Sequence, residues 1–177
     1  MNKLIPNNTI IFLDNFSEKI GQTIAWLTLF MVITQFSVVI LRYLFNIGWI
    51  AMQESILFMH ALVFMLGAAY TLKHDGHVRV DIFYQKMGLR GKAWVDVLGT
   101  LFLLLPVCLF IISNSWEYVS SSWSLHEGSR EAGGLAGLFI LKTSIILLPT
   151  LLILQGVSLL LKNLSILFGS ESDNDHV

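Results

Sequence analysis

The stretch Ile20–Leu41, "IGQTIAWLTLFMVITQFSVVIL", contains 22 consecutive residues without a charged side chain. A helix needs roughly 20 apolar residues to cross the hydrocarbon core of a bilayer, which is about 30 Å thick. This stretch is therefore long enough to span a membrane as one helix. It is too long, and begins too far from Met1, for a cleaved signal peptide, and no small-residue cleavage motif follows it.

Three more uncharged stretches follow, with 18 residues in 55–72, 20 in 97–116 and 19 in 143–161. Hydrophobic residues make up 55% of the chain and charged residues 13%, which is about half the charged share of a soluble domain. We predict an all-α membrane protein in one domain, residues 20–164. A lead-in over 1–19 precedes it, and an acidic, disordered tail over 165–177 follows. The four transmembrane helices are expected at about 20–42, 51–73, 94–116 and 139–162.

Lysine and arginine predict the orientation. With four spans, the two termini and the central connection share one side, which holds eight basic residues: Lys3, Lys19, Lys73, Arg79, Lys86, Arg90, Lys92 and Lys162. The other side holds three: Arg42, Arg130 and Lys142. Because basic residues concentrate in cytoplasmic connections, we expect both termini in the cytoplasm.

The connections do not resemble tight turns. Residues 42–55, "RYLFNIGWIAMQES", lack a cluster of turn residues, which predicts an interfacial helix or an extension of the second span. Residues 81–93, "DIFYQKMGLRGKA", are basic and half apolar, as in helices that lie along an anionic membrane surface, with Asp81 as N-cap. The apolar segment 131–139, "EAGGLAGLF", is expected to be re-entrant or to lie on the outer surface.

Two prolines fall inside predicted spans, Pro106 in the third and Pro149 in the fourth. Proline removes a backbone donor and clashes with the preceding turn. Both spans should therefore be kinked.

The segment 73–81, "KHDGHVRVD", is the most polar part of the inner side. One interpretation is a salt-bridge knot around Arg79 and Asp81 that orders the turn and docks a partner; the other is a solvated basic loop. His74 and His77 are ligand candidates or interfacial side chains. A haem requires axial ligands from facing helices at matching depth, and only His60 lies well inside a span, so we expect no metal and no cofactor.

The outer side has a second polar group. Glu54 begins the second span, and a carboxylate there is costly unless hydrated or paired, so pairing with Arg42 or Lys142 is expected. Lys142 could also extend to the interface or contact a lipid phosphate. The loop 115–135, "SWEYVSSSWSLHEGSREAGGL", is either a docking surface for a periplasmic protein or solvated, and no nucleophile–base pair indicates catalysis.

The span interiors contain few polar side chains, Gln35, His60 and Gln155. A carrier of ions or anions places charged groups or broken helices near the midplane, so this chain alone is a poor candidate for a substrate pathway. The net charge of −1 argues against nucleic acid as a partner. A single cysteine, Cys108, excludes an internal disulfide and a multi-cysteine zinc site.

Four motifs in order along the chain resemble a known family: "RYLFNIGW…QES", "GAAYTLKHDGHVRVD", "EGSREAGGL" and the spacing Lys142…Pro149…Gln155. The chain resembles the small membrane subunit (Q, or DctQ-type) of tripartite ATP-independent periplasmic (TRAP) transporters. The resemblance covers about residues 16–164, and "GHVRVD" is its most specific part.

The resemblance implies a non-enzymatic scaffold in the bacterial inner membrane. Its partners would be a large elevator-type membrane subunit (M, or DctM-type), a periplasmic substrate-binding protein and membrane lipids, with phospholipid possible at the interface. The complex would import an organic acid with sodium, and both ions and substrate would bind in the large subunit.

The resemblance also assigns residue roles. His77, Arg79 and Asp81 would form the cytoplasmic turn and contact the large subunit. The binding protein would dock near Glu127, Ser129, Arg130 and Glu131. Arg42, Glu54 and Lys142 would stabilise the outer subunit or lipid interface.

Two alternatives stay open at this point. One is a haem- or quinone-linked membrane anchor of a respiratory complex. The other is a small carrier or channel that acts alone.

Overall fold

The computed structural model describes residues 7–78 and 81–168, and the regular elements in these ranges are all helices. Four long apolar segments could cross a membrane. They are α1 (Asn7–Phe45), α2 (Ile50–Lys73), the continuous segment Leu89–Ser124, and α6 (Leu138–Phe168). Each covers one predicted span, which confirms the all-helical class with four apolar helices.

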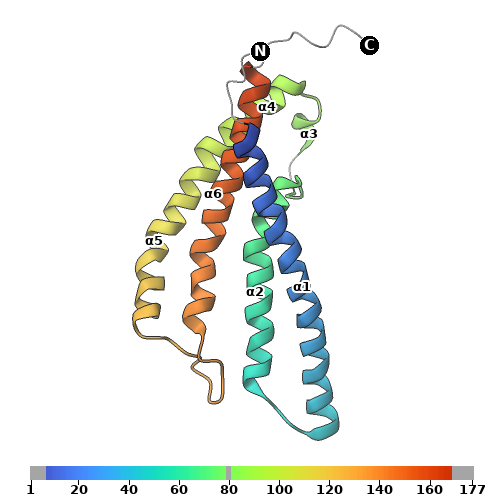
Figure 1. The fold of residues 1–177 in the computed structure, drawn as a ribbon, viewed down its shortest axis with the longest axis vertical. Helices are drawn as coiled ribbons and strands as arrows, with labels where there is room; N and C mark the ends of the chain where they lie inside the picture. The colour runs from blue at the N-terminus through green and yellow to red at the C-terminus, as the bar shows by residue number, and fades with distance from the viewer. Residues whose placement is uncertain (1–6, 79–80, 169–177) are drawn as a thin grey trace.

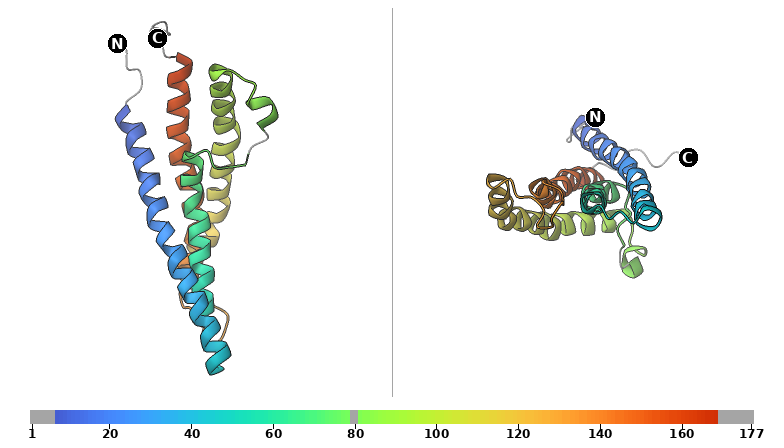
Figure 2. Two further views of the ribbon diagram at one scale, coloured as in Figure 1. Left: turned by 90° about the vertical axis from the view of Figure 1, so that its right-hand side faces the viewer. Right: turned by 90° about the horizontal axis from the view of Figure 1, so that it is seen from below.

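The long helices form an elongated arrangement with α2 and α6 in the middle (Figures 1 and 2). The helix α1 packs on α2 and α6, and α5 (Leu105–Ser124) packs on α6 from the other flank. We call the lower end in Figure 1 the loop end and the upper end the terminal end. The loop end carries the α1–α2 connection and the loop 125–137; the terminal end carries residues 74–78 and 81–88.

The helix α1 begins at Asn7, well before the expected start near residue 20, so much of the expected lead-in is helical. Polar side chains in this region, Asp14, Ser17 and Glu18, hydrogen-bond to α6 or α2. Interhelical partners satisfy these groups, and the polar composition therefore does not end the helix.

At the loop end, both helices extend into the predicted interfacial segment. The helix α1 continues to Phe45 and α2 begins at Ile50, so the extension alternative holds and only four residues connect them. Asn46 makes the turn with φ 55°, a left-handed conformation that asparagine tolerates better than most residues.

At the terminal end, the predicted surface helix over 81–93 is wrong in its length. A one-turn helix, α3 (Asp81–Tyr84), is followed by a turn, and α4 (Leu89–Gly99) already belongs to the third long segment. Tyr84 Oη donates to Asp96 Oδ2 across 2.9 Å, which holds α3 against α4.

The two prolines lie in different backbone settings, and the predicted kinks stay predictions. Pro106 lies in the first turn of α5, directly after the π-helical turn η1 (Thr100–Leu104), so the break in regular hydrogen bonding precedes the proline. Pro149 lies within the continuous helix α6. Opposite η1, α6 presents Gly156, where a Cβ would come within 2.9 Å of Leu104, so glycine permits this close packing.

Few side chains are buried, and many large apolar ones are exposed along both flanks, for example Trp26 and Phe36 on α1, Phe102 on η1 and Phe110 on α5. In water such faces would drive aggregation. They are the surfaces expected to contact lipid or other membrane helices.

Candidate interaction site at the loop end

Glu54, in the second turn of α2, bonds the loop 125–137 through both carboxylate oxygens. Ser129 Oγ donates to Oε1, and the backbone N–H of Leu135 donates to Oε2 across 2.6 Å. The loop also closes on itself, since Ser129 N–H donates to Leu135 O across 2.8 Å. A Cβ on Gly134 would overlap the side chains of Ser129 and Glu54, so this approach requires glycine.

The expected pairing of Glu54 with Arg42 or Lys142 is therefore wrong. Within the described ranges its partners are a hydroxyl and a backbone amide of the loop. Arg42 lies in the last turn of α1 and is exposed. Up to Leu138, segment 131–139 is an irregular loop bonded to α2, and its predicted place at or within the outer surface stays a prediction.

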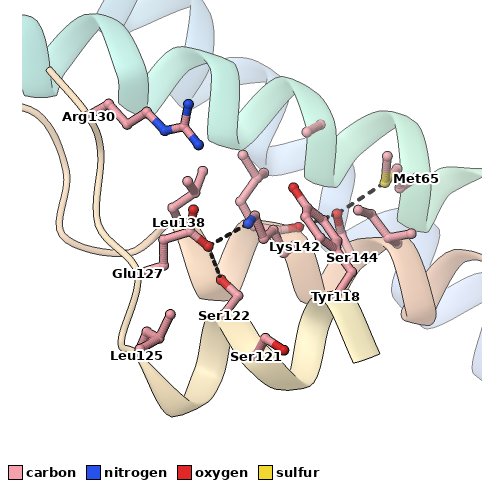
Figure 3. A pocket seen from close by; sticks show the side chains of 13 residues that line it. Met65, Tyr118, Ser121, Ser122, Leu125, Glu127, Arg130, Leu138, Lys142 and Ser144 are labelled. Atoms are coloured by element: carbon pink, nitrogen blue, oxygen red, sulfur yellow. Dashed lines mark hydrogen bonds and ion pairs between the residues drawn. The ribbon is translucent and has the colours of Figure 1, made fainter. Parts of the chain in front are cut away.

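A second carboxylate, Glu127, joins the same loop to α5 and α6 (Figure 3). Lys142 Nζ on α6 donates to Glu127 Oε2 across 2.5 Å, and Ser122 Oγ on α5 donates to the same oxygen across 2.7 Å. Lys142 also lies 4.0 Å from the centre of the Tyr118 ring, close enough for a cation–π interaction. The hydrogen bonds from Lys142 and Ser122 hold the pKa of the Glu127 carboxyl below its ordinary value.

Aromatic contacts complete the support of the loop. Trp123 Nε1 donates to Thr143 Oγ1 across 2.8 Å, and its ring meets Phe139 edge-on at 4.7 Å. His126, with φ 47°, turns the chain out of α5 and also contacts the Phe139 ring. The helix ends therefore fix the loop on both sides.

An open groove of about 680 Å³ lies between α2, α5 and α6 beneath the loop (Figure 3). Its polar wall includes Glu127, Lys142 and Tyr118, and its apolar wall includes Met65 and Ile145. Glu127 and Lys142 on this wall form an ion pair, and Arg130 also lines the groove.

The predicted docking residues therefore divide into two groups. The side chains of Glu127 and Ser129 form hydrogen bonds within the chain, and these bonds hold the loop in place. Arg130 and Glu131 are exposed in the loop, and Arg130 also lines the groove. Both lie on the loop that the Glu54 and Glu127 bonds hold.

The terminal end has a polar cluster that sequence reasoning missed, between α1 and α6. Asp14 accepts hydrogen bonds from Gln155 (3.1 Å), Ser158 (2.7 Å) and Lys162 (2.5 Å). Ser17 Oγ donates to Gln155 Oε1 across 2.6 Å. The spacing of Gln155, Ser158 and Lys162 places them on one helical face, and this pattern could have predicted a polar contact with another helix.

Glu18 links the same end of α1 to α2. Its Oε2 accepts from Lys73 Nζ at 2.6 Å and lies 2.9 Å from His74 Nε2. Close packing continues at Gly21, where a Cβ would overlap the Tyr70 ring. The polar segment after α2 is thus anchored by α1.

The predicted cytoplasmic knot is only partly described. His77 is exposed in the connection after α2. Asp81 is the first residue of α3, and Arg79 lies outside the described residues. The roles assigned to these three residues stay predictions.

Four apolar helices of membrane-spanning length, with clusters of paired charges towards their ends, define a multi-pass membrane protein. The family model "Tripartite ATP-independent periplasmic transporters, DctQ component" matches residues 30–165, and the chain belongs to this family. No curated protein and no solved structure matches the chain.

Family membership confirms the resemblance seen in the sequence. It identifies a transporter component and not an enzyme, and it gives no support to a haem- or quinone-linked anchor. The match includes the loop-end site but begins after Asp14 and Glu18. The α1 half of the terminal-end clusters therefore lies outside the matched region.

Proposed function

We propose that this chain is a static brace for the large, elevator-type membrane subunit of a sodium-driven importer of an organic acid. The supporting observation is the distribution of charge. The middle of each long helix has no Asp, Glu, Lys or Arg, and the charged side chains near the ends form ion pairs such as Lys162–Asp14 and Lys142–Glu127. A path for an anion would require charged or unwound groups at mid-depth.

The broad apolar flanks support the same proposal. Large exposed side chains on α1 and α5 suit contacts with membrane helices of the other TRAP component that the family implies, and with lipid. An elongated set of helices widens its partner's footprint in the bilayer more than a compact bundle of equal length does. The fixed clusters at both ends oppose relative motion of its helices.

The chain is proposed to lie in the bacterial inner membrane with the terminal end in the cytoplasm. The eight-to-three excess of basic residues supports this orientation. In a Cys108→Ser background, a cysteine at Gly48 should react with an impermeant maleimide added to intact cells, and one at Gly76 should not. The reverse labelling pattern would overturn the orientation.

In this orientation the loop end faces the periplasmic substrate-binding protein. Arg130 and Glu131 are the charged side chains proposed to meet that protein, on a loop whose shape is set by Glu54 and Glu127. Opposite charges adjacent on one loop tip suit orientation of a docked partner better than general attraction.

Sodium-driven uptake in proteoliposomes tests the proposal. Vesicles with the large subunit, this chain and the binding protein should take up substrate; vesicles lacking either membrane component should not. Transport by this chain alone, or full transport by the large subunit without it, would overturn the brace.

A further inference from the structure

The central helix α2 has one uncovered side. Helices α1 and α6 both pack against α2, and beyond its first residue, Ile50, the exposed residues of α2 are Leu57, His60 and Phe64. Gly67 follows at the same spacing, so the four residues form a single stripe with intervals of three, four and three. We call Leu57, His60, Phe64 and Gly67 the α2 stripe.

Because of His60, lipid tails alone are a poor contact for this stripe. It lies ten residues from the start of the 24-residue helix, or about 15 Å along the axis, near mid-membrane depth. It is exposed, and within the described ranges no hydrogen bond or ring contact to its imidazole is present. Hydrocarbon offers no hydrogen-bonding group, so an imidazole in contact with lipid tails stays unsatisfied.

Several other polar side chains in the spans bond within their own helix. Thr34, Ser37 and Asn114 each donate to a carbonyl one turn earlier. His60 has no such local bond among the described residues. Gln35 on α1 also lacks one and lies ten residues from Phe45, so the two unsatisfied groups occur at a similar depth on adjacent antiparallel helices.

Gly67 provides an independent observation. A Cβ there would meet nothing within 4 Å, so no packing within this chain requires glycine at this position. Small residues on membrane helices allow a second helix backbone to approach closely. The stripe thus combines a close-approach point, two large apolar side chains and an imidazole that needs a partner.

We propose that the α2 stripe is the surface on which a membrane-spanning helix of the large TRAP subunit packs, with a hydrogen-bonding group of that helix meeting His60 at mid-depth. This inference rests on the proposed function, since it takes the large subunit as the occupant. A lipid tail cannot supply the hydrogen bond, and the three-four spacing matches the seam of left-handed helix pairs common in membranes.

The test compares two glycines that are both open to added side chains. Gly67 lies on the stripe, and Gly99 lies at the end of α4, where a Cβ also meets nothing within 4 Å. Neither substitution to leucine should disturb the fold of this chain. The affinity-tagged chain is co-expressed with the large subunit and purified in mild detergent, and recovery of the large subunit is measured.

Gly67→Leu should lower recovery of the large subunit at least tenfold with unchanged expression and unfolding temperature, while Gly99→Leu keeps wild-type recovery. His60→Leu should lower recovery severalfold, and His60→Gln should restore part of it. Equal recovery for Gly67→Leu and Gly99→Leu would overturn the inference. So would a wild-type homodimer, formed without the large subunit, that Gly67→Leu abolishes. Failure of the wild-type chain to recover any large subunit would instead count against the proposed function.

Discussion

The two ends of the molecule are both held by carboxylates, but the carboxylates bond to different partners. At the terminal end, Asp14 and Glu18 join side chains of separate long helices. At the loop end, Glu54 and Glu127 join helices to an irregular loop, partly through a backbone amide. The terminal-end bonds therefore set how α1 lies on its neighbours, and the loop-end bonds set the shape of one exposed loop.

This difference indicates that the terminal-end bonds stabilise the helix packing and the loop-end bonds shape a surface for recognition. Between membrane helices there is no hydrophobic driving force, so interhelical hydrogen bonds and close contacts contribute much of the specificity of packing. Loss of a terminal-end bond should therefore weaken the whole arrangement. Loss of a loop-end bond should loosen the loop and leave the helices in place.

The largest effect is expected for Asp14→Leu. The substitution leaves Lys162, Ser158 and Gln155 without their shared acceptor, and we expect a loss of about 2–4 kcal/mol in the free energy of unfolding. Because Lys162 is partly exposed, the value should not reach that of a fully buried pair. Thermal unfolding in detergent is the measurement. Asp14→Asn keeps an acceptor oxygen, so its free energy of unfolding should lie between those of the wild type and Asp14→Leu. Equal stability of all three proteins would contradict the role of the cluster.

A smaller effect is expected for Glu54→Ala. The loop loses its bonds from Ser129 Oγ and Leu135 N–H, so it should open locally more often while the helices keep their packing. Hydrogen exchange at the Leu135 amide should accelerate at least tenfold while amides in the helix interiors change little. Glu117→Ala, at an exposed glutamate of α5, is the matched control. Unchanged exchange at Leu135 would show that Glu54 does not hold the loop.

The smallest effect is expected from acid. Lys142 and Ser122 lower the pKa of Glu127 in the folded protein, so this carboxylate stabilises the loop at neutral pH. The contribution is lost as the pH falls below the ordinary carboxyl pKa and through the lower, folded value. Fluorescence of Trp123, with the other tryptophans replaced by phenylalanine, should change over this range. The change should be absent in Glu127→Gln, and an identical pH profile in both proteins would rule out Glu127 as the titrating group.

The middle of each span could be predicted from sequence because an uncharged stretch of about 20 residues is enough to indicate a membrane-spanning helix. The ends could not, because they depend on partners far along the chain. Asp14 lies in the early part of α1 and hydrogen-bonds to Lys162 of α6, and Glu54 bonds Ser129 and Leu135 instead of Arg42 or Lys142. The surface helix after Asp81 was overestimated because amphipathic composition does not reveal where the chain turns back. The loop residues Glu127, Ser129, Arg130 and Glu131 and the helix residue Glu54 were all singled out from sequence, but the bonds by which Glu54 and Glu127 hold the loop were not predicted.

The central claim is that this chain stays rigid while a partner moves the solute. Ser144 Oγ on α6 and Met65 Sδ on α2 are 3.1 Å apart, so cysteines at both positions in a Cys108→Ser background lie within reach of a short bis-methanethiosulfonate reagent, which bridges two thiols through reducible disulfides. Sodium-driven uptake by the reconstituted complex is then compared before cross-linking, after cross-linking and after reduction. We expect equal uptake in all three states, matching single-cysteine controls. Loss of uptake on cross-linking and recovery on reduction would show that these helices move during transport, which contradicts a static brace.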